Sequence, residues 1–141
     1  MDGGAGGSVA AIEALIARYI DLFNAGDFAG AFACYRMPFT WLSGRHAITV
    51  ASREEFLAMM TSTKAALEAK GLSASRLERV VVTMMEPHVA VAGVVVRRMR
   101  ADGTELAELG GGYVVHDDGA GWRLAQNFSA TVESVAGLAR P

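Results

Sequence analysis

Apolar side chains recur every three or four residues near the start of the chain, which is the spacing of helices with one buried face. Ser8 can cap the first helix, and Asn24-Ala25-Gly26 can end it, because asparagine and glycine tolerate the left-handed backbone. Asp27 can cap a second, short helix, which we expect to stop at Met37-Pro38. The apolar positions are Ile12, Leu15, Ile16, Tyr19, Ile20 and Phe23 in the first helix and Phe28, Phe32 and Tyr35 in the second.

The next segment predicts two short strands and a third helix. The pattern predicts strands at residues 39–42 and 46–50, with a turn at Ser43-Gly44 between them. Ser52 and Glu55 have the spacing of a capping box, so a helix should begin directly after Ser52. Its apolar face comprises Phe56, Met59, Met60, Thr63 and Leu67, and Lys70-Gly71 should end it.

From residue 72 the pattern changes to β-branched runs separated by turn residues. It predicts antiparallel strands over about 73–86, 88–101, 104–117 and 122–133. The Asp102-Gly103 turn would set Arg97 opposite Glu108. Because glycine weakens strands, the run at 110–112 predicts a bulge or a sharp bend.

Helices followed by a strand meander indicate an α+β fold with helices on one face of an antiparallel sheet. Residues 80–82 and 89–96 are apolar on both faces, so the second face also needs cover. A symmetric homodimer or the tail at 134–141 could supply it. We therefore expect a flexible tail over 1–7, one domain over 8–133 and a second tail over 134–141.

The composition excludes several classes of protein. The chain has 141 residues, of which 52% are hydrophobic and 20% charged, with a formal net charge of −2. These values argue against disorder and against binding to nucleic acid or anionic membranes. The longest apolar run, 89–96, is too short to span a bilayer, and the N-terminus has no signal-peptide pattern, so a cytoplasmic location is expected. The single cysteine, Cys34, predicts a buried hydrophobic side chain more than a nucleophile.

The stretch A-R-Y-I-D-L-F-N-A-G-D-F at 17–28, followed by a second short helix, resembles the nuclear transport factor 2-like superfamily in its SnoaL-like and ketosteroid isomerase-like branch. The resemblance covers nearly the whole chain in element order but only the first thirty-odd residues in motif. It implies a cone-shaped curved sheet wrapped around a long helix and a deep apolar pocket, commonly in a dimer.

The same resemblance implies a hydrogen-bond donor at Tyr19, which matches the isomerases' Arg-Tyr pair. The alternative is a core tyrosine bonded to a backbone carbonyl. The isomerase aspartate base has no counterpart in residues 39–44, so steroid-type isomerisation is not expected. The resemblance also implies a second, protonated acid that donates a hydrogen bond to the substrate oxygen. This chain has Tyr113 or a glycine at the matching strand position, and Tyr113 could act as a second donor there.

The other candidate site residues, the histidines and Arg97, do not form recognisable motifs. The three histidines have no metal-binding spacing, so neither a metal nor another cofactor is expected. His88 or His46 could be a general base if it pointed into the pocket, although a surface position is the more ordinary interpretation. Arg97 could bind a ligand carboxylate if it faced inward, or could lie on a solvated edge beside Glu105 and Glu108.

The last strand predicts which side chains face the pocket. Trp122, Leu124, Gln126 and Phe128 share one face, so Gln126 could orient a ligand or bond to Tyr19 or backbone. Soft and aromatic side chains are typical of adaptable apolar cavities. The complete expected lining is Tyr19, Phe23, Tyr35, Trp41, Phe56, Met59, Met60, Arg97, Tyr113, Gln126 and Phe128.

Together these patterns predict a pocket protein that binds a small, mostly hydrophobic molecule. Isomerase, cyclase or hydratase-type proton transfer would use Tyr19 as donor and His88 or a bound water as base. The alternative is a non-catalytic dimerisation or protein-association module whose pocket is filled by its own side chains. A third interpretation is an accessory subunit of a tailoring enzyme.

Overall fold

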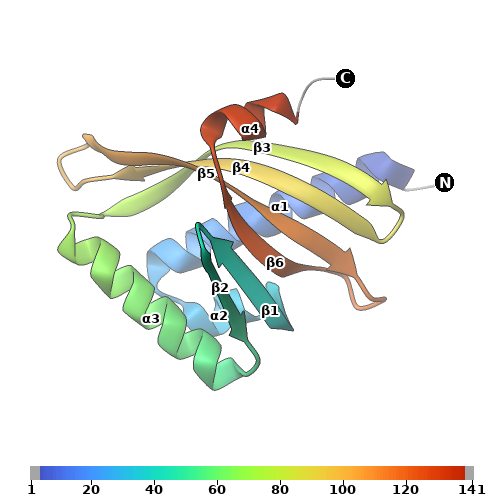
Figure 1. The fold of residues 1–141 in the computed structure, drawn as a ribbon, viewed down its shortest axis with the longest axis horizontal. Helices are drawn as coiled ribbons and strands as arrows, with labels where there is room; N and C mark the ends of the chain where they lie inside the picture. Colours follow the sequence, from blue (N-terminus) through green and yellow to red (C-terminus); the bar gives the residue numbers. More distant parts are fainter. Residues whose placement is uncertain (1–3, 139–141) are drawn as a thin grey trace.

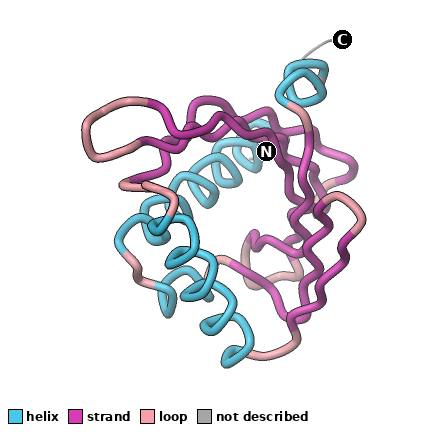
Figure 2. Tube along the Cα trace, turned by 60° about the vertical axis from the view of Figure 1, so that its left-hand side comes forward, coloured by secondary structure: helices cyan, strands magenta, loops and turns pink. Residues whose placement is uncertain are grey.

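The protein folds into a curved sheet with three helices on one side and a short fourth helix on the other (Figures 1 and 2). The structure is a computed structural model that describes residues 4–138. The elements are α1 (Gly4–Ala25), α2 (Phe28–Phe32), β1 (Tyr35–Ser43), β2 (His46–Val50), α3 (Arg53–Ala69), β3 (Ala74–Glu86), β4 (Val89–Met99), β5 (Glu105–Asp117), β6 (Trp122–Ala130) and α4 (Val132–Gly137).

The sheet has six strands in the order β2-β1-β6-β5-β4-β3 and does not close. The predicted α+β class and the strand meander are confirmed. Strands β3 to β6 pair antiparallel in sequence order, and Arg97 lies opposite Glu108 as expected. β1, however, pairs with β6 in parallel, so the sheet is mixed. That pairing joins distant parts of the chain, which no local turn signal predicts.

The break between α1 and α2 anchors the end of α1 to the sheet. Gly26 has a φ of 72°, which ends the helix, and Asp27 caps α2 by accepting from the Gly30 amide at 2.8 Å. The Asn24 side chain donates to the Ser75 carbonyl and accepts from the Ser75 amide, each at 2.8 Å. These two bonds fix the position of α1 relative to β3.

Several predicted boundaries differ from the structure, among them the end of the last strand, expected at 133: β6 ends at Ala130, and α4 occupies Val132–Gly137. α1 already begins at Gly4, so Ser8 lies inside the helix and the expected tail over 1–7 is partly helical; residues 1–3 lie outside the described part. α2 ends at Phe32, and Tyr35 opens β1, which is longer than the predicted strand at 39–42. Backbone pairing between Tyr35 and Leu124 of β6 extends the strand at the expense of the helix.

The capping box before α3 is confirmed. The Ser52 hydroxyl accepts from the Glu55 amide at 3.2 Å. The Glu55 carboxylate in turn accepts from the Ala51 amide at 3.1 Å. Because both bonds satisfy amide groups at the start of the segment, α3 begins where the sequence predicts.

The two faces of β4 show how the sheet is covered. Ala90, Ala92 and Val94 are buried on the inner face, in the core shared with α1. Gly93 and Val95 lie on the outer face, and the α4 segment packs on Gly93: a Cβ added there would lie 2.7 Å from a methyl carbon of Leu138. The segment after β6 thus supplies part of the second cover.

The bulge predicted at the glycine run is wrong. Residues 110–112 pair in regular register with β4. Packing requires glycine at position 112 instead, because a Cβ there would lie 2.3 Å from the ring of Phe128. The register shift occurs in β6, where Ala125 is the extra residue between the pairs Val114–Gln126 and Val115–Leu124.

Within the described residues, no helix has the length and apolar character needed to cross a membrane.

Candidate functional site

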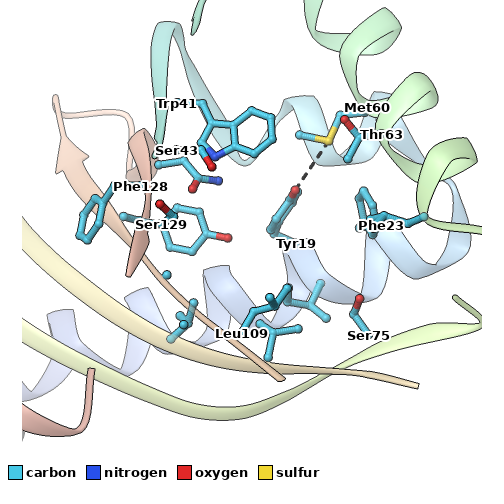
Figure 3. A pocket seen from close by; sticks show the side chains of 18 of the residues that line it. Tyr19, Phe23, Trp41, Ser43, Met60, Thr63, Ser75, Leu109, Phe128 and Ser129 are labelled. Atoms are coloured by element: carbon cyan, nitrogen blue, oxygen red, sulfur yellow. Dashed lines mark hydrogen bonds between the residues drawn. The ribbon is translucent and has the colours of Figure 1, made fainter. Parts of the chain in front are cut away.

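A cavity of about 420 Å³ lies between α1, α3 and the inner face of the sheet (Figure 3). Most of its wall is apolar or aromatic. Seven of the expected lining residues border it: Tyr19, Phe23, Trp41, Met59, Met60, Tyr113 and Phe128. Polar side chains that also border it are Ser43, Thr63, Ser75, Arg98, Asn127 and Ser129.

Tyr19 places its hydroxyl next to the cavity and leaves it weakly bound. The side chain is 7% exposed, and its hydroxyl donates to the Met60 sulfur at 3.6 Å (Figure 3), with the Tyr35 hydroxyl as a further polar neighbour. A thioether sulfur is a weak acceptor, so a ligand oxygen or nitrogen could replace it. Burial raises the pKa of Tyr19 to about 12, and the group is therefore a neutral donor at ordinary pH.

Tyr113 reaches the same cavity from the sheet. Its inward direction follows from regular pairing with Ala92 of β4 and Asn127 of β6. The Tyr113 and Tyr19 rings meet edge to face, with centroids 6.4 Å apart. Burial raises the pKa of Tyr113 as well, so the cavity holds two protonated phenols.

Tyr35 and Phe56 belong to a filled region beside the cavity and do not line it, which corrects the prediction. The Tyr35 ring lies 5.0 Å from the Phe56 ring and 4.8 Å from the Phe39 ring, measured between centroids. The Tyr35 hydroxyl is buried and makes no well-formed hydrogen bond among the described residues, but the Tyr19 hydroxyl and the Asn127 side chain lie close enough to act on its pKa. Burial raises its pKa well above the ordinary value.

The bulge at Ala125 reverses the alternation expected along β6. Leu124 faces inward, but Asn127 and Ser129 replace Gln126 and Phe128 on the inner face. Gln126 therefore does not line the cavity, and the expectation that it orients a ligand is corrected. Phe128 borders the cavity, yet its ring packs against Gly112 and points away from Tyr19 (Figure 3).

Arg97 and Arg98 lie on opposite faces of β4. Arg97, the predicted carboxylate ligand, faces outward, with nitrogens 2.9 Å from Glu105, 3.2 Å from Glu108 and 3.7 Å from Glu78. Arg98 borders the cavity instead. Of the two interpretations of Arg97, the solvated edge beside Glu105 and Glu108 is confirmed, and the prediction of Arg97 as a ligand-binding residue is wrong.

None of the histidines lines the cavity. His88 lies exposed in the turn between β3 and β4, and His46 is exposed at the start of β2. His116 contacts Arg36. The predicted base at His88 is therefore misplaced for chemistry in the cavity, and no Asp or Glu lines it either, within the part of the chain that the structure describes.

No group of three His, Cys, Asp or Glu side chains between residues 4 and 138 is arranged to hold a metal ion.

A family model described as NTF2-like protein (DUF6841) matches residues 10–131. The chain belongs to this NTF2-like family, which confirms the resemblance read from residues 17–28. A search among curated proteins finds no match.

Solved structures support the fold. An NTF2-like protein with a cystatin-like fold from Novosphingobium aromaticivorans is similar over 95% of this chain and 90% of that one, with a TM-score of 0.72 and 23% identity. A cystatin-like domain of unknown function from Nostoc punctiforme gives 0.69 and 22%, over 94% of this chain and 83% of that one.

A ketosteroid isomerase-like protein from Erwinia carotovora atroseptica is also similar. It has a TM-score of 0.61 and 19% identity over 87% of this chain and 95% of that one. At these identities the likeness concerns the fold alone.

Proposed function

We propose that the protein binds a small, mostly hydrophobic molecule in the cavity, and that Tyr19 donates a hydrogen bond to a polar atom of that molecule. One observation carries the proposal: a hollow of about 420 Å³ adjoins a buried hydroxyl whose one well-formed hydrogen bond among the described residues runs to a thioether sulfur. This volume lies in the range of about 300–1,000 Å³ typical of small-molecule sites. The hollow also argues against a module with a filled interior.

Binding is favoured over proton-transfer chemistry. Removing a proton beside a carbonyl requires a base within hydrogen-bond reach. The lining holds no histidine and no carboxylate within the described residues, and Tyr19 with a pKa of about 12 stays protonated near neutral pH. We therefore propose a carrier or sensor for its ligand, without a catalytic step at His88.

Native mass spectrometry of the purified full-length protein tests this proposal. We expect a mass excess of a few hundred daltons that disappears on denaturation, which would reveal a co-purified molecule. Replacing Thr63 by phenylalanine should reduce that excess, because Thr63 lines the cavity. A protein that carries no ligand and takes up none of a panel of hydrophobic compounds would contradict the proposal.

We further propose that two copies associate through the outer face of the sheet. The α4 segment packs on Gly93, but Val91 and Val114 remain half-buried, and Leu42 is 41% exposed. Apolar faces of this kind commonly mark interfaces. The same spectrum should show a dimer mass, and Val91→Glu should shift it to the monomer. A monomeric wild-type protein would contradict this part.

A further inference from the structure

Arg98 is the one charged side chain in the cavity wall, considering the residues that the structure describes. It is half-buried and lies on the inner face between Ser75 of β3 and Ala107 of β5. Its positive charge acts on the Tyr19 hydroxyl, lowering the pKa that burial raises, which agrees with both groups facing one hollow.

The Arg98 guanidinium has no charged or hydrogen-bonding partner among residues 4–138. Between residues 4 and 138, no carboxylate lies within 4.0 Å of it, and it makes no hydrogen bond. Burial lowers its pKa, but an arginine stays charged at neutral pH. A half-buried guanidinium without a partner is unfavourable, because five N–H donors lose part of their hydration.

The neighbouring arginine shows that the fold can neutralise such a group. Arg97 meets the carboxylates of Glu78, Glu105 and Glu108 on the outer face. On the inner face at Arg98, the described chain supplies apolar neighbours and neutral polar groups only. An anion that balances Arg98 would therefore have to enter the cavity from solution.

We propose that Arg98 binds the carboxylate of a small amphipathic acid whose apolar body fills the cavity. The inference rests on the proposed function and specifies its ligand class. A guanidinium matches a carboxylate with two parallel N–H···O bonds, which are strengthened where water is scarce. A single cation suits a monoanion better than a doubly charged phosphate, and the apolar wall along Val96, Leu109 and Met60 suits an aliphatic or aromatic body.

The test compares acids with their neutral amides, which have nearly the same shape. Calorimetric titration of the full-length protein would use 2-naphthoate against 2-naphthamide and decanoate against decanamide. We expect at least one acid to bind about tenfold or more tightly than its amide, as a charge-assisted hydrogen bond implies. Arg98→Met should abolish that preference by weakening acid binding, while amide binding changes by less than about twofold.

Two further variants separate Arg98 from general effects of charge and folding. Arg97→Met removes an adjacent arginine on the outer face and should leave both affinities unchanged. Arg98→Lys keeps the positive charge but loses the two parallel N–H donors of the guanidinium, so it should retain part of the preference for the acid over the amide. The ratio of acid affinity to amide affinity is measured on the wild-type protein. The proposal can therefore be tested even if Arg98→Met misfolds.

Each outcome decides between the two proposals. Equal affinity for acid and amide in the wild-type protein would overturn the role of Arg98 and leave the hydrophobic site intact. A preference that Arg97→Met removes as fully as Arg98→Met would overturn it as well. If none of the four compounds binds, the proposed function fails and the Arg98 inference fails with it.

Discussion

Two neighbouring regions between the helices and the sheet use similar side chains but pack differently. In the filled region, Phe56 is fully buried, and its ring lies 5.5 Å from Phe32 and 5.0 Å from Tyr35 between centroids. In the hollow region, Tyr19 and Met60 border a cavity of about 420 Å³. Aromatic and methionine side chains therefore do not by themselves distinguish a core from a binding site.

The difference comes from what faces those side chains. The wall of the hollow includes Gly111, Ser43 and Ser129, which are too small to reach across it. The filled region instead places aromatic rings against one another. The cavity thus stays open because the residues that face it from the sheet are small, and the large side chains on the helices do not decide it.

The largest expected effect is loss of stability in the filled region. Phe56→Ala removes a ring that is 0% exposed, and we expect the free energy of unfolding to fall by about 3–5 kcal/mol. Urea denaturation monitored by circular dichroism measures it. A loss below about 1 kcal/mol would mean that this region is not packed as described.

Alkaline pH should also destabilise the protein, through its tyrosines. All three are buried, and burial raises the pKa of Tyr19 from 10.0 to about 12. Their stabilising contribution is complete below pH 10 and is lost as pH rises through the folded-state pKa values, with about 3 kcal/mol expected from Tyr19 alone.

Absorbance at 295 nm, recorded with circular dichroism across pH 9–13, measures this effect. Tyrosinate should appear only above pH 10, together with unfolding. One tyrosine that ionises near pH 10 in a folded protein would show that the hollow is ordinary bulk solvent.

Filling the hollow should affect binding more than stability. Thr63→Phe places a ring in the cavity wall and should weaken binding of the preferred acid at least about tenfold, with less than about 1 kcal/mol change in stability. Thr61→Phe, on the exposed side of the same helix, is the control. Equal binding by both variants would place the ligand elsewhere.

The smallest expected effect separates two buried phenols. Tyr19→Phe should weaken ligand binding about threefold to tenfold with little change in stability, because the one well-formed hydrogen bond lost among the described residues is to a sulfur. Tyr35→Phe should weaken binding less than Tyr19→Phe, because Tyr35 does not line the cavity, and should change stability little, because its hydroxyl makes no well-formed hydrogen bond among the described residues. The reverse pattern of binding would contradict the assignment of the two regions.

Much of the fold was predictable because its signals are local. The cap at Ser52, the stop at Gly26 and the hairpin at Asp102-Gly103 each act within a few residues. The parallel pairing of β1 with β6 and the packing of α4 on Gly93 depend on distant contacts, and no short pattern specifies them.

The candidate site was less predictable, because the register of strand pairing decides which side chains point into the cavity. The hairpin placed Arg97 opposite Glu108 correctly. However, Val94 and Val95 are both buried, so the apolar pattern could not say which face met the helices. At Ala125 one extra residue moved Asn127 inward and Gln126 outward, since a shift of one position exchanges the faces of a strand.

The most direct test locates a ligand by the methyl groups of the methionines. Met59 and Met60 border the cavity, whereas Met85 is 63% exposed outside it. In the protein labelled with carbon-13 at its methionine methyls, adding 2-naphthoate should shift the Met59 and Met60 signals and leave Met85 unchanged. Saturation with that acid and with decanoate that leaves the Met59 and Met60 signals in place would contradict a ligand site in this cavity.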